Sequence, residues 1–159
     1  MSTQVATNDE KTTALDARFL SRILEEGYGK GAWHGPDMKA ALADVTEELA
    51  FRRPAPGRHS IAEIALHHTY YVRSVRARLL GKTPEPFVME GEDWFALPGT
   101  PPLSFSGIAT LLEDEQRLLA ATVAKVERTD ASLELVLGIT CHAVYHAGQV
   151  QLVKALLGA

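Results

Sequence analysis

The feature of the sequence that most constrains the fold is a stretch of 19 residues, 135–153, that contains no Asp, Glu, Lys or Arg. Its length approaches the span of a lipid bilayer. The stretch contains His142, His146 and Gln149, however, and polar side chains of this kind are costly in hydrocarbon. We therefore interpret it as the central helix of an all-α protein, buried by other helices, rather than as a membrane span.

Helical periodicity continues through the rest of the chain, and no segment alternates convincingly like a half-buried strand. The recurrence of apolar residues and the signals at helix ends predict helices over about 15–26, 36–50, 60–80, 106–128 and 131–157. Ser60 and Glu63 have the spacing of a capping box. Residues 82–104 contain five prolines and predict a long crossover. The expected fold is a four-helix bundle with this crossover and an extra short N-terminal helix.

Length, charge and cysteine content limit the class of protein. The 159 residues suit a flexible tail over 1–13 followed by one helical domain over 14–159. The tail lacks the apolar core of a signal peptide, and the single cysteine, Cys141, cannot form an intramolecular disulfide, so we expect a cytoplasmic protein. A net charge of −4 offers no basic surface for a phosphate backbone, so we expect no nucleic-acid partner, and no membrane partner either.

Histidines on two predicted helices could bind one metal ion. His142 and His146 are four residues apart, so both imidazoles lie on one face of the last helix, with Gln149 beside them. Two histidines supply only half of a tetrahedral set, so another helix must supply the rest. Periodicity directs His68 to the core and His67 to the edge of a cleft. A catalytic ion needs an accessible position, which favours His67, but spacing alone does not decide between the two.

Other polar and aromatic residues could lie around such a site, and each has a structural alternative. His68 could be a ligand, a hydrogen-bond partner of a ligand or a buried polar residue, and Gln149 could bind a ligand histidine or tie two helices together. Glu63 could face the metal or cap its own helix, and Tyr71 could reach the cleft or pack in the core. Trp33 and His34 could close the end of the bundle near the site, or they could simply pack in the turn before the next helix.

The last helix is apolar on the face opposite the histidines as well. That face carries Leu133, Leu137, Val144 and Ala147. In a four-helix bundle one side of each helix faces solvent, so an apolar outer face predicts a homodimer.

Several segments resemble the DinB-like (damage-inducible) family. They are Ser60-Ile-Ala-Glu-Ile-Ala-Leu-His67, Val75-Arg-Ala-Arg-Leu-Leu-Gly81 and His142-x3-His146-x-Gly-Gln149. Trp33-His-Gly-Pro36 and Glu92-Asp-Trp94 resemble a subgroup, and the likeness covers about residues 15–157. The resemblance implies a four-helix bundle with a three-histidine metal site whose ligands fall on His67, His142 and His146. His68 stands where this family usually has an aliphatic residue.

The resemblance implies chemistry only in outline. Some relatives are metal-dependent thiol S-transferases, others are maleylpyruvate isomerases, and many have no assigned activity. All-nitrogen ligation suits a divalent ion such as Zn, Ni, Fe or Cu. We therefore expect a metal-dependent enzyme that activates a thiol or water and acts on a small molecule, such as a low-molecular-weight thiol. The alternatives are a non-catalytic metal-binding stress-response protein and a metal-free helical dimer with a small-molecule pocket.

Overall fold

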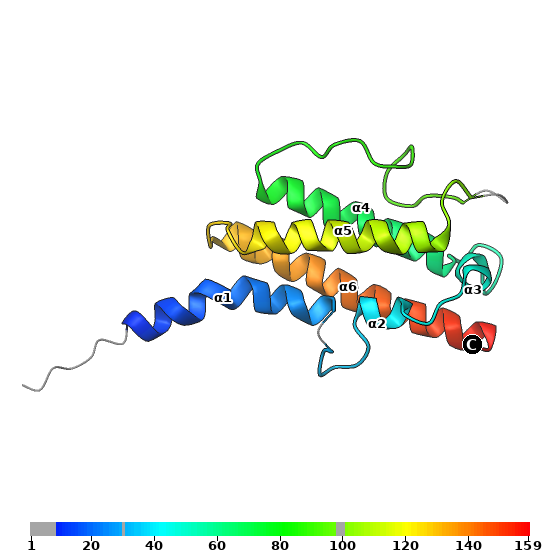
Figure 1. Cartoon of the computed structure of the whole chain (residues 1–159), viewed down its shortest axis with the longest axis horizontal. Coiled ribbons are helices and arrows are strands. Elements are labelled where there is room, and N and C mark those ends of the chain that lie inside the picture. The colour runs from blue at the N-terminus through cyan, green and yellow to red at the C-terminus, as the bar shows by residue number, and fades with distance from the viewer. Residues whose placement is uncertain (1–8, 30, 98–100) are drawn as a thin grey trace, which may run out of the picture.

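Four long α-helices form a bundle in the computed structural model, which describes residues 9–29, 31–97 and 101–159 (Figure 1). The long helices are α1 (Asp9–Gly27), α4 (Ile61–Leu79), α5 (Phe105–Val123) and α6 (Asp130–Leu157). Two short helices, α2 (Met38–Leu42) and α3 (Glu47–Phe51), lie in the connection between α1 and α4. Every regular element in the described residues is helical, so the all-α prediction is confirmed.

The helix expected over 36–50 is interrupted, which corrects the prediction of one continuous helix. Asp37 caps α2 by accepting a hydrogen bond from the Ala40 N–H (3.0 Å), and Thr46 caps α3 by accepting from the Leu49 N–H (3.3 Å). A side chain that satisfies a backbone donor three residues ahead begins a new helix. The short elements of this fold are therefore α2 and α3, whereas the N-terminal helix α1 has 19 residues.

Helix α1 begins at Asp9, six residues before the expected start at Leu15. Of the tail expected over 1–13, residues 1–8 lie outside the described residues. The division into a tail and one domain over 14–159 stays a prediction.

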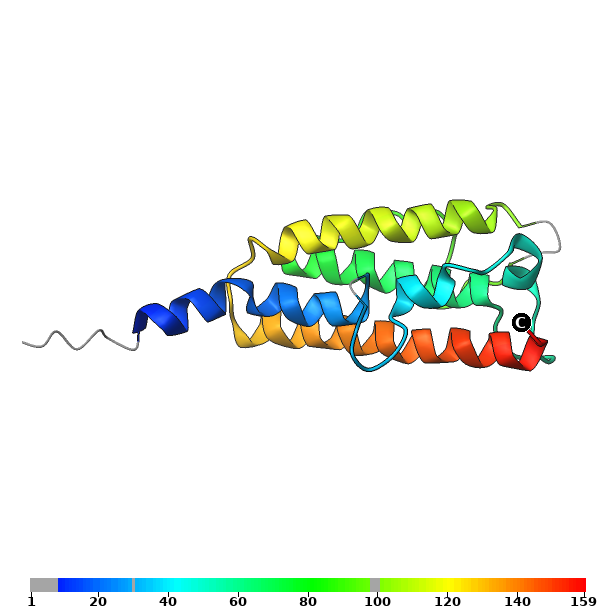
Figure 2. The same cartoon turned by 60° about the horizontal axis from the view of Figure 1, so that its bottom comes forward.

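Helix α6 packs in the bundle along one side only, whereas Leu137, Leu152 and Leu156 on its other side are exposed, so the expectation that other helices bury it all round is wrong. The helix packs against α1, α2 and α4, and α4 packs in turn against α5 (Figure 2). The core side chains Val136, Ile139 and Val150 of α6 are buried, together with Ile64 of α4 and Leu112 of α5. None of the described helices has both the length and the apolar character that crossing a bilayer requires.

The connection between α4 and α5 passes along the outside of α4 (Figure 1). Aromatic contacts attach it there: the rings of Phe87 and Phe95 lie with their centroids 5.6 and 5.7 Å from that of Tyr70. Phe95 is buried in the core. This attachment brings the neighbouring residues Asp93 and Trp94 over the side of α4 that carries His67.

Candidate metal centre

Three histidines from α4 and α6 converge on one point. The Nε2 atom of His142 lies 3.1 Å from Nε2 of His67 and 3.2 Å from Nε2 of His146. Ligand nitrogens about 2.0–2.1 Å from one ion are separated by roughly 3.0–3.4 Å, depending on the coordination geometry. All three candidate ligand atoms lie within 4.8 Å of one another. The arrangement therefore fits the ligands of a single cation.

The second ring nitrogen of two of these histidines meets an oxygen acceptor. His67 Nδ1 lies 2.9 Å from the backbone oxygen of Asp93, and His146 Nδ1 lies 2.7 Å from Gln149 Oε1. Each Nδ1–H can donate to that oxygen, which leaves the lone pair on Nε2. Gln149 also donates to the Tyr145 hydroxyl at 3.0 Å, so both contacts of its amide are to α6 itself.

His68 occupies a different position from His67. Its side chain is fully buried, and its Nδ1 lies 2.9 Å from Nδ1 of His142, on the side of that ring away from the convergence point. His68 Nε2 lies 3.1 Å from the side-chain amide of Gln116 on α5. The structure thus brings His67, and not His68, to the convergence point, and it makes His68 a partner of His142.

Burial keeps these imidazoles neutral. Together with the neighbouring imidazoles, it lowers the pKa of His142 to about 3 and that of His146 to about 4. Burial also lowers the pKa of His67, and it lowers that of His68 well below its ordinary value. The neutral imidazole is the form that binds metals, so at neutral pH no proton has to leave before an ion binds.

The crossover supplies the outer wall of the centre. The Trp94 ring stacks on the His67 ring at a centroid distance of 3.9 Å. The His59 ring stacks on the other face of Trp94, at 3.6 Å. Tyr71 donates from its hydroxyl to Asp93 Oδ1 at 3.0 Å. Asp93 has φ = 66°, which is uncommon outside glycine but tolerated by Asp, and this conformation occurs beside the site.

Three of the residues proposed for the surroundings lie elsewhere. Glu63 completes the predicted capping box with Ser60 and pairs with Arg53, so its carboxylate already has partners. Trp33 is 90% exposed, and its ring contacts only His34 among the described aromatic contacts. His34 bonds through Nε2 to the Glu26 backbone oxygen at 3.0 Å. The structure does not bring these residues to the histidines.

Sequence reasoning missed three residues of the surroundings: Asp93, Trp94 and Gln116. Asp93 contacts His67 Nδ1 through its backbone oxygen and, at 3.2 Å, through its carboxylate, but it lies in a loop whose path the sequence pattern does not predict. Gln116 is a polar residue at a buried position of α5, and an unexplained polar residue in an apolar stripe was the available signal. Trp94 contributes to the family likeness, but its position over His67 depends on the path of the crossover.

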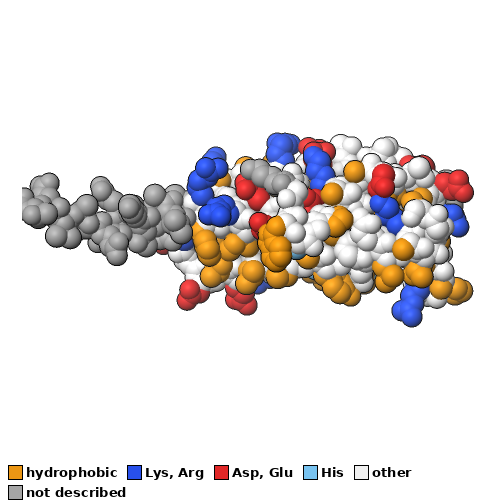
Figure 3. Space-filling model, turned by 90° about the horizontal axis from the view of Figure 1, so that it is seen from below, with side chains coloured by type: hydrophobic (Ala, Val, Ile, Leu, Met, Phe, Trp, Pro, Cys, Tyr) orange, Lys and Arg blue, Asp and Glu red, His pale blue; other side chains and the backbone are white. Residues whose placement is uncertain are grey.

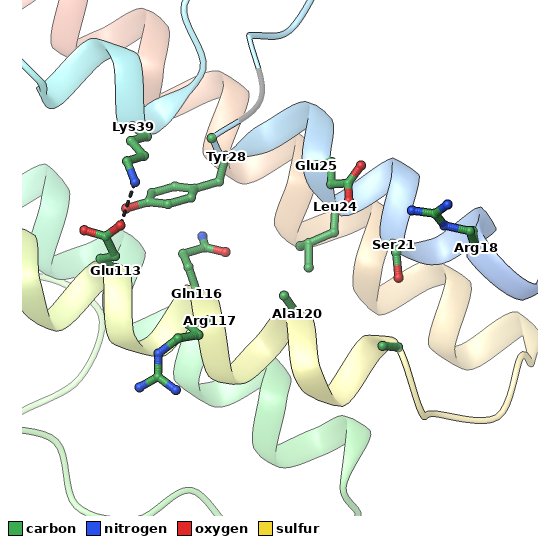
Figure 4. A pocket seen from close by; sticks show the side chains of 12 residues that line it. Arg18, Ser21, Leu24, Glu25, Tyr28, Lys39, Glu113, Gln116, Arg117 and Ala120 are labelled. Atoms are coloured by element: carbon green, nitrogen blue, oxygen red, sulfur yellow. Dashed lines mark hydrogen bonds and ion pairs between the residues drawn. The ribbon is translucent and has the colours of Figure 1, made fainter.

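Two pockets border this region. An open pocket of about 290 Å³ between α4 and α6 includes the candidate ligand His142 and also Tyr71. A larger pocket of about 620 Å³ lies between α1 and α5 and contains none of the histidines (Figure 4). Gln116 lines this second pocket. Its amide contacts one ring nitrogen of His68, and His142 contacts the other. The second pocket has the greater volume, but the candidate ligand His142 lines the first.

A family model described as the DinB superfamily matches residues 32–150, about three quarters of the chain. This range includes the three converging histidines, His68 and Gln116. Neither a curated protein nor a solved structure matches the chain at a significant level.

Proposed function

This chain belongs to the DinB superfamily, and from that membership and the geometry of its histidines we propose that it is a metal-dependent enzyme that activates a thiol or water. The observation that carries the proposal is the convergence of three neutral imidazole nitrogens. In the described residues the group contains three protein ligands and no fourth, which is typical of catalytic sites, where one position stays open. The proposed substrate is a small molecule, such as a low-molecular-weight thiol, in the cytoplasm.

Neutral imidazoles suit Zn, Ni or Fe. When bound, such an ion lowers the pKa of a coordinated thiol or water and so supplies a nucleophile at neutral pH. The chain orients the ligands: Asp93 and Gln149 hold the Nδ1–H groups of His67 and His146. Burial and the Asp93 contact raise the pKa of Tyr71, so this hydroxyl stays protonated and keeps the Asp93 carboxylate in place. Trp94 covers His67 and excludes water from that side.

A non-catalytic metal-binding protein is the second candidate. The burial of His67 and His146 favours it, because an ion enclosed by the bundle would add to the stability of the fold. The difference between the two candidates is whether an exogenous ligand can reach the ion.

The test has two stages. First, the purified protein is loaded separately with Zn, Ni and Fe, and the metal content is measured after desalting. We expect about one ion per chain, and loss of that ion in the His142→Ala and His146→Ala variants. A protein that retains no ion under any of these conditions would contradict both candidates.

Second, the Co(II)-loaded protein is titrated with a low-molecular-weight thiol in the Cys141→Ser background, because the exposed Cys141 could otherwise bind the ion of another molecule. A new sulfur-to-cobalt absorption band, together with turnover of the thiol with an electrophile, supports the enzyme. An unchanged spectrum with every thiol supports the non-catalytic candidate instead.

A further inference from the structure

The pocket between α4 and α6 extends away from the histidine centre along the two helices. One end is set by Tyr71 and His142, whose rings lie 5.0 Å apart. The helices run in opposite directions, so the lining continues forward along α4 and backward along α6 (Figure 1). It reaches Arg78 and Glu134 after seven and eight residues. At 1.5 Å per residue, this end lies about 10–12 Å from the centre.

The middle of the pocket is apolar. Val75 and Ile139, which are both buried side chains, line it together with Leu135. Gly138 also lines it, and a Cβ added to Gly138 would meet no atom within 4 Å. The pocket therefore has room for an aliphatic segment at this point.

The far end carries two opposite charges without partners in the described residues. Arg73 and Arg76 of α4 both pair with the buried Glu115, at 3.3 and 3.0 Å. Arg78 forms no ion pair within the described part of the chain, and neither does Glu134. A ligand that carried only an anion at this end would approach the Glu134 carboxylate, and one that carried only a cation would approach the Arg78 guanidinium.

We propose that the pocket binds a zwitterionic substrate with an amino-acid head group. Its carboxylate pairs with Arg78, its ammonium pairs with Glu134, and an aliphatic segment passes Val75, Gly138 and Ile139. The group that reacts then lies at the histidines, about 10 Å from the head. Only this last step depends on the proposed function, because the head group is selected by charges outside the metal centre.

The head group is tested with three probes of equal chain length on the metal-loaded protein: 2-aminooctanoic acid, octanoic acid and octylamine. Binding is followed by the NMR shift of the Gly138 amide. We expect 2-aminooctanoic acid to bind most tightly, and Arg78→Gln and Glu134→Gln each to weaken it by about two- to fivefold, as exposed charge pairs do. Arg117→Gln, on α5 beside the other pocket, is the control and should change nothing. Equal affinity for octanoic acid, unaffected by Arg78→Gln, would overturn the proposal.

The aliphatic segment is tested with Gly138→Leu, which adds a side chain at a pocket-lining position where the Cβ meets no atom within 4 Å. Gly148→Leu is the matched control, because a Cβ there also meets open space on the same helix but does not line this pocket. We expect Gly138→Leu to abolish binding of 2-aminooctanoic acid, and Gly148→Leu to retain it. Retained binding in Gly138→Leu would place the probe elsewhere and contradict the proposal.

A fourth probe, 2-amino-8-sulfanyloctanoic acid, separates this inference from the proposed function. If its thiol leaves the Co(II) spectrum unchanged while 2-aminooctanoic acid still binds with the expected charge dependence, the function fails and the pocket assignment stands. If the thiol binds the ion but Arg78→Gln and Glu134→Gln have no effect on either probe, the function stands and the pocket assignment fails.

Discussion

At the scale of single residues, each converging histidine uses its two ring nitrogens differently. Nε2 points to the common centre, and Nδ1 contacts a partner outside it. For His142 that partner is the imidazole of His68, which can accept only if its own proton is on Nε2. The His68 N–H then points at Gln116, whose amide nitrogen lies 3.1 Å from His68 Nε2, so metal binding requires this amide to turn over and present its oxygen.

This arrangement predicts a coupling between His68 and Gln116. Gln116→Leu leaves a buried His68 N–H without an acceptor, and we expect it to weaken metal affinity by about tenfold. His68→Leu removes the acceptor for His142 and should cost a similar factor, whereas His67→Leu should abolish tight binding. The double variant His68→Leu/Gln116→Leu should cost no more than His68→Leu alone, because both partners are then apolar.

Metal affinity of the four variants, measured by competition with a chromogenic chelator, checks the coupling. Additive losses in the double variant would show that Gln116 does not act through His68. A ¹⁵N spectrum of the metal-loaded protein gives a second readout, with the His68 proton expected on Nε2.

At the scale of elements, the crossover is part of the candidate site. Its aromatic attachment through Phe87 and Phe95 allows Asp93 to reach His67 Nδ1 and Trp94 to cover the ring. Because Trp94 lies between His59 and His67, it separates a ligand ring from solvent on that side. The crossover therefore covers one side of the candidate centre and also contributes Phe95 to the core.

We expect Trp94→Ala to release the ion to EDTA about tenfold faster, because water and chelator then reach the His67 side of the centre. The chain contains one other tryptophan, Trp33, which is 90% exposed. Trp33→Ala is therefore the matched control and should release the ion at the rate of the unchanged protein. Stopped-flow measurement of chelator capture checks this, and equal rates in the two variants would argue against a covering role.

At the scale of the whole molecule, the buried histidines make the stability of the metal-free protein depend on pH. The pKa of His142 is about 3 in the folded chain and about 6.5 in an unfolded one. Between these values the unfolded chain binds a proton that the folded chain does not, so lowering the pH favours unfolding. This contribution to stability is complete above about pH 6.5 and is lost as the pH falls towards the folded value.

We therefore expect the titration of His142 alone to lower the melting temperature of the metal-free protein by about 4–8 °C between pH 7 and pH 5, and the other buried histidines to add to that fall. His142→Leu should show a smaller fall over the same range, because it lacks one of the groups that titrate differently in the two states. Differential scanning fluorimetry of both proteins after EDTA treatment checks this. An equal fall in both would assign the pH dependence to other groups.

The outer surface bears on the expected homodimer. Hydrophobic side chains gather along one edge of the face seen in Figure 3. On α6 the large exposed hydrophobic residues include Leu137, Leu152 and Leu156, whereas Ala147, which we expected on the outer face, is buried. The exposed residues repeat at helical spacing, which favours self-association through α6.

We predict that light scattering gives twice the mass of one chain, and that Leu152→Glu gives the mass of a single chain with unchanged helical content. Glu48→Gln, an exposed change on the short helix α3, serves as the control. A single-chain mass for the unchanged protein at micromolar concentration would contradict the dimer.

Much of this protein follows from local patterns in its sequence. Periodicity predicts the four long helices, although not the break between α2 and α3, and Ser60 with Glu63 predicts the start of α4. The i, i+4 spacing of His142 and His146 places them on one face whatever surrounds them. These features depend on residues a few positions apart, and for that reason a single sequence contains them.

The tertiary structure decided what depends on how distant segments meet. His67 and His68 lie about 100° apart on α4. Packing against α5 and α6 sets the rotation of that helix, which directs His67 to the convergence point and His68 to Gln116. The Asp93 backbone oxygen and the Trp94 ring reach the centre only through the path of the crossover. Periodicity specifies which residues share a face, but the packing of neighbouring elements determines what that face meets.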